Sequence, residues 1–302
     1  MSPARRSWTW PRGRRRLPGR ARALLAALLA ALAASSCAIV DYEQRRWIFQ
    51  PVTHTWVRAE AALPGMEEVW IDYRATEPPH GDDGQVRLHG LWLPHPEPQA
   101  PVLLFLHGVR WDVRASAPRM RQLHALGFSV LAIDYRGFGR SSEALPSESL
   151  IAEDSRAAWA WLAERHPTTR RFIYGHSLGA TVAVRLAAES GDESGLIVDG
   201  GFTSTTDVLR STRWGWLPIT WMITQHFDAG SRIATVGSPV LVVHGRDDTM
   251  IAPALGRELY RRAAEPKRFV LVEGAVHENT TEVGQAVLGP VVRELFGVGF
   301  ER

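Results

Sequence analysis

The chain has 302 residues, of which 45% are hydrophobic and 22% charged, a composition typical of a folded globular protein and unlike that of a disordered one. Its formal charge of +3 would suit a nucleic-acid-binding protein, but residues 1–36 hold eight arginines and no acid, which leaves 27 of the 35 basic side chains against 32 acidic ones in the rest. Because a mildly acidic body repels a phosphate backbone, we expect no nucleic-acid partner.

The arginine-rich start is followed by an apolar run over residues 23–34, then by Ser35, Ser36 and the single cysteine, Cys37. This order of basic, apolar and small residues is typical of a secretory signal peptide. Residues 34–37 resemble the lipobox of bacterial lipoproteins, whose cysteine is lipidated and becomes the new N-terminus, although Ala34 stands where leucine is more usual. We therefore predict residues 1–36 as a lipoprotein-type signal peptide and Cys37 as the lipidation site.

An uncleaved signal anchor is the alternative, because the apolar residues continue through Val40 and approach the roughly 20 residues that a membrane span requires. Either interpretation keeps the arginine cluster in the cytoplasm. The body is then exported and anchored on the extracytoplasmic side of a membrane, as a periplasmic or cell-surface protein. With no second cysteine, it can form no internal disulfide bond.

A mixed aromatic and polar lead-in over residues 37–67 precedes one predicted domain over 68–302. Two runs of β-branched and aromatic residues, 69–73 and 86–93, flank a turn-forming segment and predict an antiparallel pair of strands. Six short apolar runs follow, as expected for strands buried on both faces: 102–106, 129–133, 171–174, 196–198, 239–243 and 269–272.

Segments with apolar residues at helical spacing alternate with these strands. They cover residues 151–165, 180–188, 252–264 and 283–296. An alternation of this length predicts an α/β fold with a mostly parallel, eight-stranded type of sheet and helices on both of its faces.

Residues 175–179 read Gly-His-Ser-Leu-Gly and fit the pattern G-x-S-x-G. In this pattern the serine lies on a turn tight enough to project its hydroxyl group from a sheet, and the glycines remove side chains that would clash there. Because so short a pattern can arise by chance, its flanks decide its meaning. A strand-like run ends at Tyr174 and a helical run begins at Ala180, which makes Ser177 the candidate nucleophile.

A serine hydroxyl needs a histidine base that is itself held by a third group. In this type of fold the acid and then the histidine follow the serine, in loops after later strands. The run 239–243 leads to Asp247 and Asp248, and the run 269–272 leads to His277, which is the candidate base. Three other histidines flank turns and are expected to make structural hydrogen bonds: His107, His176 and His244.

Together these motifs resemble the α/β-hydrolase superfamily, particularly bacterial serine hydrolases related to the monoacylglycerol-lipase, serine-aminopeptidase-like and protein-depalmitoylase-like branches. The resemblance covers about residues 85–296. The family's acid follows a strand ending in His-Gly with the spacing G-x-x-D, which matches Asp248 and leaves Asp247 as the alternative. Its base lies in a G-x-x-H or G-x-G-H turn, which matches His277, with Val276 in place of the commoner glycine.

Two further segments carry the resemblance. Residues 103–108 resemble the strand and His-Gly turn after which the next residue, here Val109, supplies one backbone amide of the oxyanion hole. The residue after the nucleophile, Leu178, would supply the second. Residues 134–141 resemble the family's D-Y-R-G-x-G-x-S turn, a marker of the fold.

Between the sixth and seventh predicted strands, residues 203–238 are more than a crossover requires and predict a small helical cap. Its apolar side chains suit a substrate pocket above Ser177, although they can equally serve to attach the cap to the domain. These pocket candidates are Trp214, Trp216, Trp221, Met222 and Phe227.

The resemblance implies a serine hydrolase that cleaves an ester or thioester through an acyl-enzyme, acting on a small-molecule or lipid-like acyl substrate. A peptidase of the proline-iminopeptidase kind is one alternative. A membrane-tethered binding module that has kept the fold and lost the chemistry is another. The sequence shows neither metal-ligand spacing nor a phosphate-binding glycine loop, so we expect no metal and no cofactor.

Overall fold

The computed structural model describes residues 37–50, 63–77, 84–109 and 111–299. The predicted signal peptide or anchor, residues 1–36, lies outside them. Residues 37–49 are helical, and Cys37 is an exposed, free thiol on this helix. Across the described ranges, no helix combines the length and the apolar character needed to cross a membrane.

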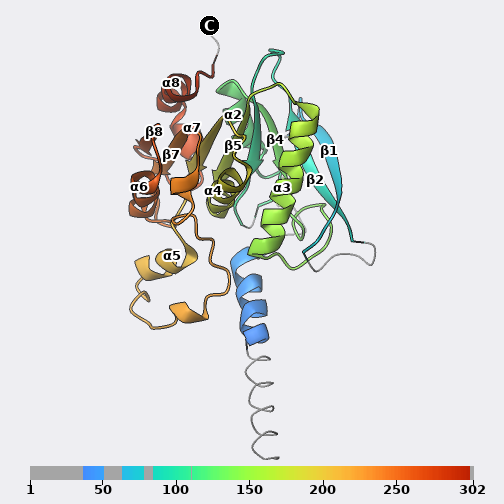
Figure 1. Ribbon diagram of the computed structural model, residues 1–302. Helices are drawn as coiled ribbons and strands as arrows, with labels where there is room; N and C mark the ends of the chain where they lie inside the picture. Colours follow the sequence, from blue (N-terminus) through green and yellow to red (C-terminus); the bar gives the residue numbers. More distant parts are fainter. Residues whose placement is uncertain (1–36, 51–62, 78–83, 110, 300–302) are drawn as a thin grey trace, which may run out of the picture. The chain divides into compact units, whose positions relative to one another are not determined.

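An eight-stranded sheet forms the centre of the domain, in the order β1-β2-β4-β3-β5-β6-β7-β8 (Figure 1). The first two strands pair antiparallel, β2 also runs antiparallel to β4, and all the other neighbours are parallel. The bounds are β1 Glu67–Arg74, β2 Gln85–Leu93, β3 Val102–Leu106, β4 Ser129–Ile133, β5 Arg171–His176, β6 Gly195–Asp199, β7 Val240–Gly245 and β8 Lys267–Val272. The predicted fold class, a mostly parallel sheet covered by helices, is confirmed.

Helices cover both faces of the sheet because successive strand residues point to opposite sides. In β3, Val102 and Leu104 belong to the core cluster beneath one set of helices, whereas Leu103 and Phe105 belong to the other cluster. The first set comprises α3 Glu148–Arg165, α4 Leu178–Ser190 and α6 Pro253–Arg262. The second comprises α2 Ala117–Ala125, α7 Thr280–Val283 and α8 Gln285–Phe296.

The helix bounds differ from the predicted ranges by a few residues, and the predicted helix over 283–296 is divided between α7 and α8. Helix α3 begins three residues before the predicted start, because the Ser147 hydroxyl accepts a hydrogen bond from the Leu150 N–H (3.2 Å) and caps the first turn. Helix α2 was not predicted. Its sequence has few apolar residues and several polar or charged ones, and the charged residue Arg119 is buried.

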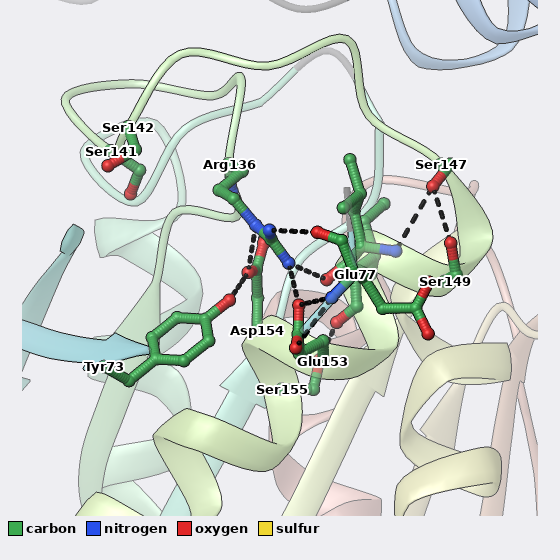
Figure 2. A network of polar contacts seen from close by, with 12 residues as sticks. Tyr73, Glu77, Arg136, Ser141, Ser142, Ser147, Ser149, Glu153, Asp154 and Ser155 are labelled. Atoms are coloured by element: carbon green, nitrogen blue, oxygen red, sulfur yellow. Dashed lines mark hydrogen bonds and ion pairs between the residues drawn. The ribbon is translucent and has the colours of Figure 1, made fainter. Parts of the chain in front are cut away.

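Arg136 lies in the turn that follows β4 and is only 1% exposed. Figure 2 shows its guanidinium between the carboxylates of Glu153 and Asp154 on α3. Arg136 donates from Nε to Asp154 Oδ1 (2.7 Å) and from Nη2 to Glu153 Oε2 (2.6 Å), and the Tyr73 hydroxyl donates to the same Asp154 oxygen (2.5 Å). These contacts fasten the turn after β4 to α3 and to β1.

Removal of one partner of this buried pair should be costly. Asp154→Ala leaves the Arg136 guanidinium buried with half of its neutralising charge gone, and we expect a loss of about 3–5 kcal/mol in the free energy of unfolding, measured by urea denaturation. Glu294→Ala is the control, because it breaks an exposed pair with Arg268 and should change stability little. Equal effects of the two variants would contradict this assignment.

Candidate active site

Ser177 lies on the turn between β5 and α4. Its backbone has φ 57° and ψ −123°, a region that non-glycine residues rarely adopt because the side chain crowds the backbone. The Ser177 N–H donates to the Asp199 carbonyl at the end of β6 (2.9 Å). The surrounding strands therefore hold this serine in a conformation that the isolated chain would avoid.

The two glycines of the motif are required by the packing of this turn. A methyl group on Gly175 would lie 2.2 Å from the Gly179 carbonyl oxygen, and one on Gly179 would lie 2.1 Å from the Leu106 carbonyl oxygen. Real Cβ atoms do not approach backbone oxygens so closely. The structure therefore shows the expected role of the two glycines, which is to leave room for the neighbouring backbone.

The loop after β3 lies against the same turn. A methyl group on Gly108 would lie 3.1 Å from Ser177 Cβ and 3.6 Å from Ser177 Oγ, so the backbone that leads to Val109 passes directly beside the serine. Leu178 is the first residue of α4, and the first N–H groups of a helix have no acceptor within the helix. The two predicted oxyanion donors thus belong to segments that meet at Ser177.

His277 is 4% exposed and lies in the loop after β8. Its Nδ1 donates a hydrogen bond (2.7 Å) to Asp248 Oδ2, in the loop after β7, because a carboxylate can only accept. Asp247, the alternative acid, is exposed. Within the described ranges, the buried His277 Nε2 has no hydrogen-bond partner, which leaves this nitrogen free to act as a base.

His277 and Ser177 are brought to the same place by their neighbours. The His176 ring packs against the His277 ring with the centroids 4.9 Å apart, and His176 Nε2 donates to the His277 carbonyl (2.9 Å). Burial is the main reason that the pKa of His176 lies well below its ordinary value, with the nearby Arg119 charge adding to the effect. His176 is therefore a neutral donor.

Asp248 is a carboxylate with several donors. Its Oδ1 accepts from the backbone N–H groups of Met250 (2.9 Å) and Ile251 (2.8 Å), and its Oδ2 lies 3.2 Å from His244 Nε2 as well as near His277. Burial by itself would raise the pKa of Asp248, but the hydrogen bonds from His244, His277 and the backbone outweigh burial and bring the pKa well below its ordinary value. Asp248 therefore stays ionised and favours a positive charge on His277.

The three turn-flanking histidines make the structural contacts expected of them. His244 Nε2 donates to the Ile251 carbonyl (2.9 Å) beside Asp248, and His107 Nδ1 lies 2.6 Å from the Gly108 carbonyl oxygen. His176 holds the His277 backbone, as described above. Two of them therefore support residues of the candidate site.

Sequence reasoning missed two buried charged residues behind this site, Arg119 on α2 and Asp199 at the end of β6. Arg119 Nη1 lies 2.5 Å from Asp199 Oδ2, and the carboxylate is completely buried. Asp199 could have been noticed, because it ends a parallel strand on the same edge as the other candidates. Nothing in the sequence marked Arg119 as buried, because its helix, α2, was not predicted.

The cap over residues 203–238 contains a short helix, α5 Thr205–Ser211, and two single-turn 3-10 helices, Thr220–Met222 and Ile233–Thr235. Most of its predicted pocket residues are exposed: Trp214 by 51%, Trp216 by 76%, Trp221 by 80% and Met222 by 38%. Phe227 is instead 3% exposed and packs edge-on against Phe49, with the ring centroids 5.9 Å apart. Phe227 therefore attaches the cap, which is the second of the two roles that the sequence left open for these side chains.

Comparisons with known proteins agree with this geometry. The profile of the family described as serine aminopeptidase, S33, matches residues 96–214. The uncharacterized protein Rv2307c of Mycobacterium tuberculosis is 34% identical over 278 residues, which cover 91% of this chain and 95% of that protein.

One further relative and one solved structure have named activities. The lysophosphatidylserine lipase ABHD12 of Danio rerio is 31% identical over 186 residues, 55% of this chain and 48% of that protein, so the chain matches about half the length of that lipase. The structure of the Pyrococcus furiosus esterase Pf2001 superposes with a TM-score of 0.61 at 21% identity, covering 82% of this chain and 98% of the esterase. At that identity the likeness shows the fold alone.

Asp248 should make stability depend on pH in the acidic range. A carboxylate whose pKa is lowered by folding stabilises the protein above the ordinary pKa of aspartate, about 3.9, and this contribution is lost as the pH falls toward the lower folded-state pKa. The difference in unfolding free energy between the wild type and Asp248→Asn should therefore shrink below about pH 4. Urea denaturation at several pH values measures it, with the exposed Asp247→Asn as control. A difference that is constant with pH would contradict the assigned contacts.

Proposed function

Because the chain belongs to the α/β-hydrolase family described as serine aminopeptidase, S33, we propose that it is a serine hydrolase that cleaves an acyl ester or thioester through Ser177, His277 and Asp248. The proposal rests on the hydrogen bonding of the two His277 ring nitrogens. One ring nitrogen is held by an ionised carboxylate, and the other is buried without a described partner, in a ring that packs against the neighbour of Ser177. This arrangement suits a general base.

In the proposed reaction, Ser177 Oγ attacks the acyl carbonyl carbon while His277 Nε2 takes the hydroxyl proton. Asp248 stabilises the resulting imidazolium, and the N–H groups of Val109 and Leu178 donate to the oxyanion. When the bond to the leaving alcohol or thiol breaks, His277 returns the proton to it. A water molecule then gives its proton to His277 and attacks the acyl-enzyme, which releases the acid and restores the serine.

A lipid-like ester is the substrate class that the cap favours. The cap, residues 203–238, carries the exposed tryptophans and three arginines against two aspartates, Asp207 and Asp228. Such a surface attracts apolar chains and anionic head groups. The similar lipase named above acts on lysophosphatidylserine, an anionic lipid ester.

A peptidase of the proline-iminopeptidase kind is the second candidate, because the matching family is described as an aminopeptidase. An aminopeptidase must bind a positively charged α-amine, and a carboxylate would serve this purpose. Of the cap's two aspartates, Asp207 already binds Thr203, Ser204 and Arg210, and the cap's three arginines outnumber them. Parallel assays with short-chain esters, lysophospholipids and aminoacyl amides separate the two, since an amide preference would overturn the ester proposal.

The position of Cys37 supports a further part of the proposal, that the protein is anchored on the extracytoplasmic side of a membrane. Residues 1–36 have the order of a signal peptide, and the cysteine is exposed at the start of the described chain. A lipid on Cys37, or residues 1–36 retained as an anchor, would keep the enzyme beside membrane lipids.

Ser177→Ala should abolish labelling by a fluorophosphonate probe and lower the turnover of p-nitrophenyl esters by at least about 10³-fold, because the attacking oxygen is absent. Ser190→Ala is the matched control, since this hydroxyl lies at the far end of the same helix and bonds to the Leu186 carbonyl. A Ser177→Ala enzyme that still labels would disprove the nucleophile. Failure of the wild type to label and to turn over would favour the non-catalytic binding module.

Cys37→Ser should abolish incorporation of a fatty-acid analogue in growing bacteria and release the processed protein from the membrane fraction. Cys37 is the only thiol in the sequence, so labelling of the wild type reports on this site alone among cysteines. If the variant stays in the membrane at full length and the wild type carries no lipid, residues 1–36 act as an anchor and the lipoprotein proposal is wrong.

A further inference from the structure

Arg119 and Asp199 form a buried ion pair at the carboxyl edge of the sheet. The Arg119 residue is 9% exposed and the Asp199 residue 0%. Arg119 Nη1 donates to Asp199 Oδ2 (2.5 Å), and Arg119 Nη2 donates to the carbonyl of Glu278 (2.6 Å). Glu278 directly follows His277, so one guanidinium binds both the end of β6 and the loop of the proposed base.

Asp199 contacts both the turn of Ser177 and the segment that follows His277. Its backbone carbonyl accepts the N–H of Ser177 (2.9 Å), which fixes the strained turn of the proposed nucleophile. Its Oδ1 accepts a hydrogen bond (2.7 Å) from the hydroxyl of Thr280, the first residue of α7 and three residues after His277. Its Oδ2 accepts the hydroxyl of Tyr174, three residues before Ser177, at 2.5 Å.

We propose that Arg119 and Asp199 are positioning residues that hold the loop of His277 at a fixed distance from the turn of Ser177, a role that rests on the serine-hydrolase function proposed above. Neither residue touches the reacting atoms. They act through backbone and hydroxyl groups next to Ser177 and His277.

The shape of the guanidinium explains why an arginine occupies this place. Its planar fork donates in two directions at once, to the Asp199 carboxylate and to the Glu278 carbonyl. A lysine keeps the positive charge but offers a single ammonium group, which cannot reproduce the fork. Proton transfer depends on the alignment of base and nucleophile, and a displacement of about 1 Å can cost about 10²-fold in rate.

The Arg136 network provides a matched comparison within the same chain. Arg136 is buried, with 1% of the residue exposed against 9% for Arg119, and it binds two carboxylates on another element, Glu153 and Asp154. Among the described residues, the hydrogen-bond partners of the Arg136 side chain include none of the proposed site residues. A substitution of arginine by lysine therefore perturbs a buried ion pair in both networks, but only the change at Arg119 should disturb His277.

The experiment compares Arg119→Lys with Arg136→Lys in the full chain. Both variants are expected to unfold at lower urea concentrations. Only Arg119→Lys should lower kcat for a p-nitrophenyl ester, by at least about 10-fold, because it displaces a catalytic group. Its KM should change by less than about twofold. The rate of fluorophosphonate labelling should fall with kcat. Thr280→Val, which removes only one hydroxyl that binds Asp199, should show a smaller decrease of the same kind.

A double-mutant cycle with His277→Ala separates positioning from general destabilisation. If Arg119 acts through His277, then Arg119→Lys should lower the residual rate of His277→Ala little further, because the base that it positions is already absent. Equal kcat values for Arg119→Lys and Arg136→Lys, or additive losses in the cycle, would overturn the proposal. A His277→Ala enzyme with full activity would instead disprove the proposed function itself.

Discussion

The contact between Gly179 and the Leu106 carbonyl is the constraint on which the site depends. Because a methyl group at Gly179 would lie 2.1 Å from that oxygen, the first turn of α4 can approach the end of β3 only if this residue has no side chain. The approach brings the loop of Gly108 beside Ser177. It also explains how Ser177 keeps a φ of 57°, since the turn is enclosed by β3, β5 and β6.

The proposed base is held by a different kind of force. His277 lies in a loop after β8, the edge strand of the sheet, and Ala275 in this loop packs on Gly245 at the end of β7. Loops of this kind are the more mobile parts of a domain. Polar contacts add to this packing: His176 and Arg119 bind the backbone of the loop, and Asp248 binds the ring. The site thus joins a sterically enclosed serine to a histidine that is fixed by hydrogen bonds.

The cap is connected to the segment that follows Cys37. Gln44 Nε2 donates to the Met222 carbonyl (2.5 Å), and its Oε1 accepts the Thr224 N–H (3.0 Å). Phe49 packs against Phe227 in the same region. The segment Glu43–Phe49 therefore belongs to the same packed unit as the aromatic cap.

The sequence by itself determined the alternation of strands and helices, the turn of Ser177 and the order of Asp248 and His277, because these follow from local hydrophobic period and from glycines at fixed spacing. It left the choice between Asp247 and Asp248 and the role of Phe227 open, and it missed α2. Only the tertiary structure showed which aspartate contacts His277 and that Arg119 joins Asp199 to the His277 loop. Such contacts connect residues about 30 to 160 positions apart, and no local pattern encodes them, since they arise where parallel strands bring their carboxyl ends together.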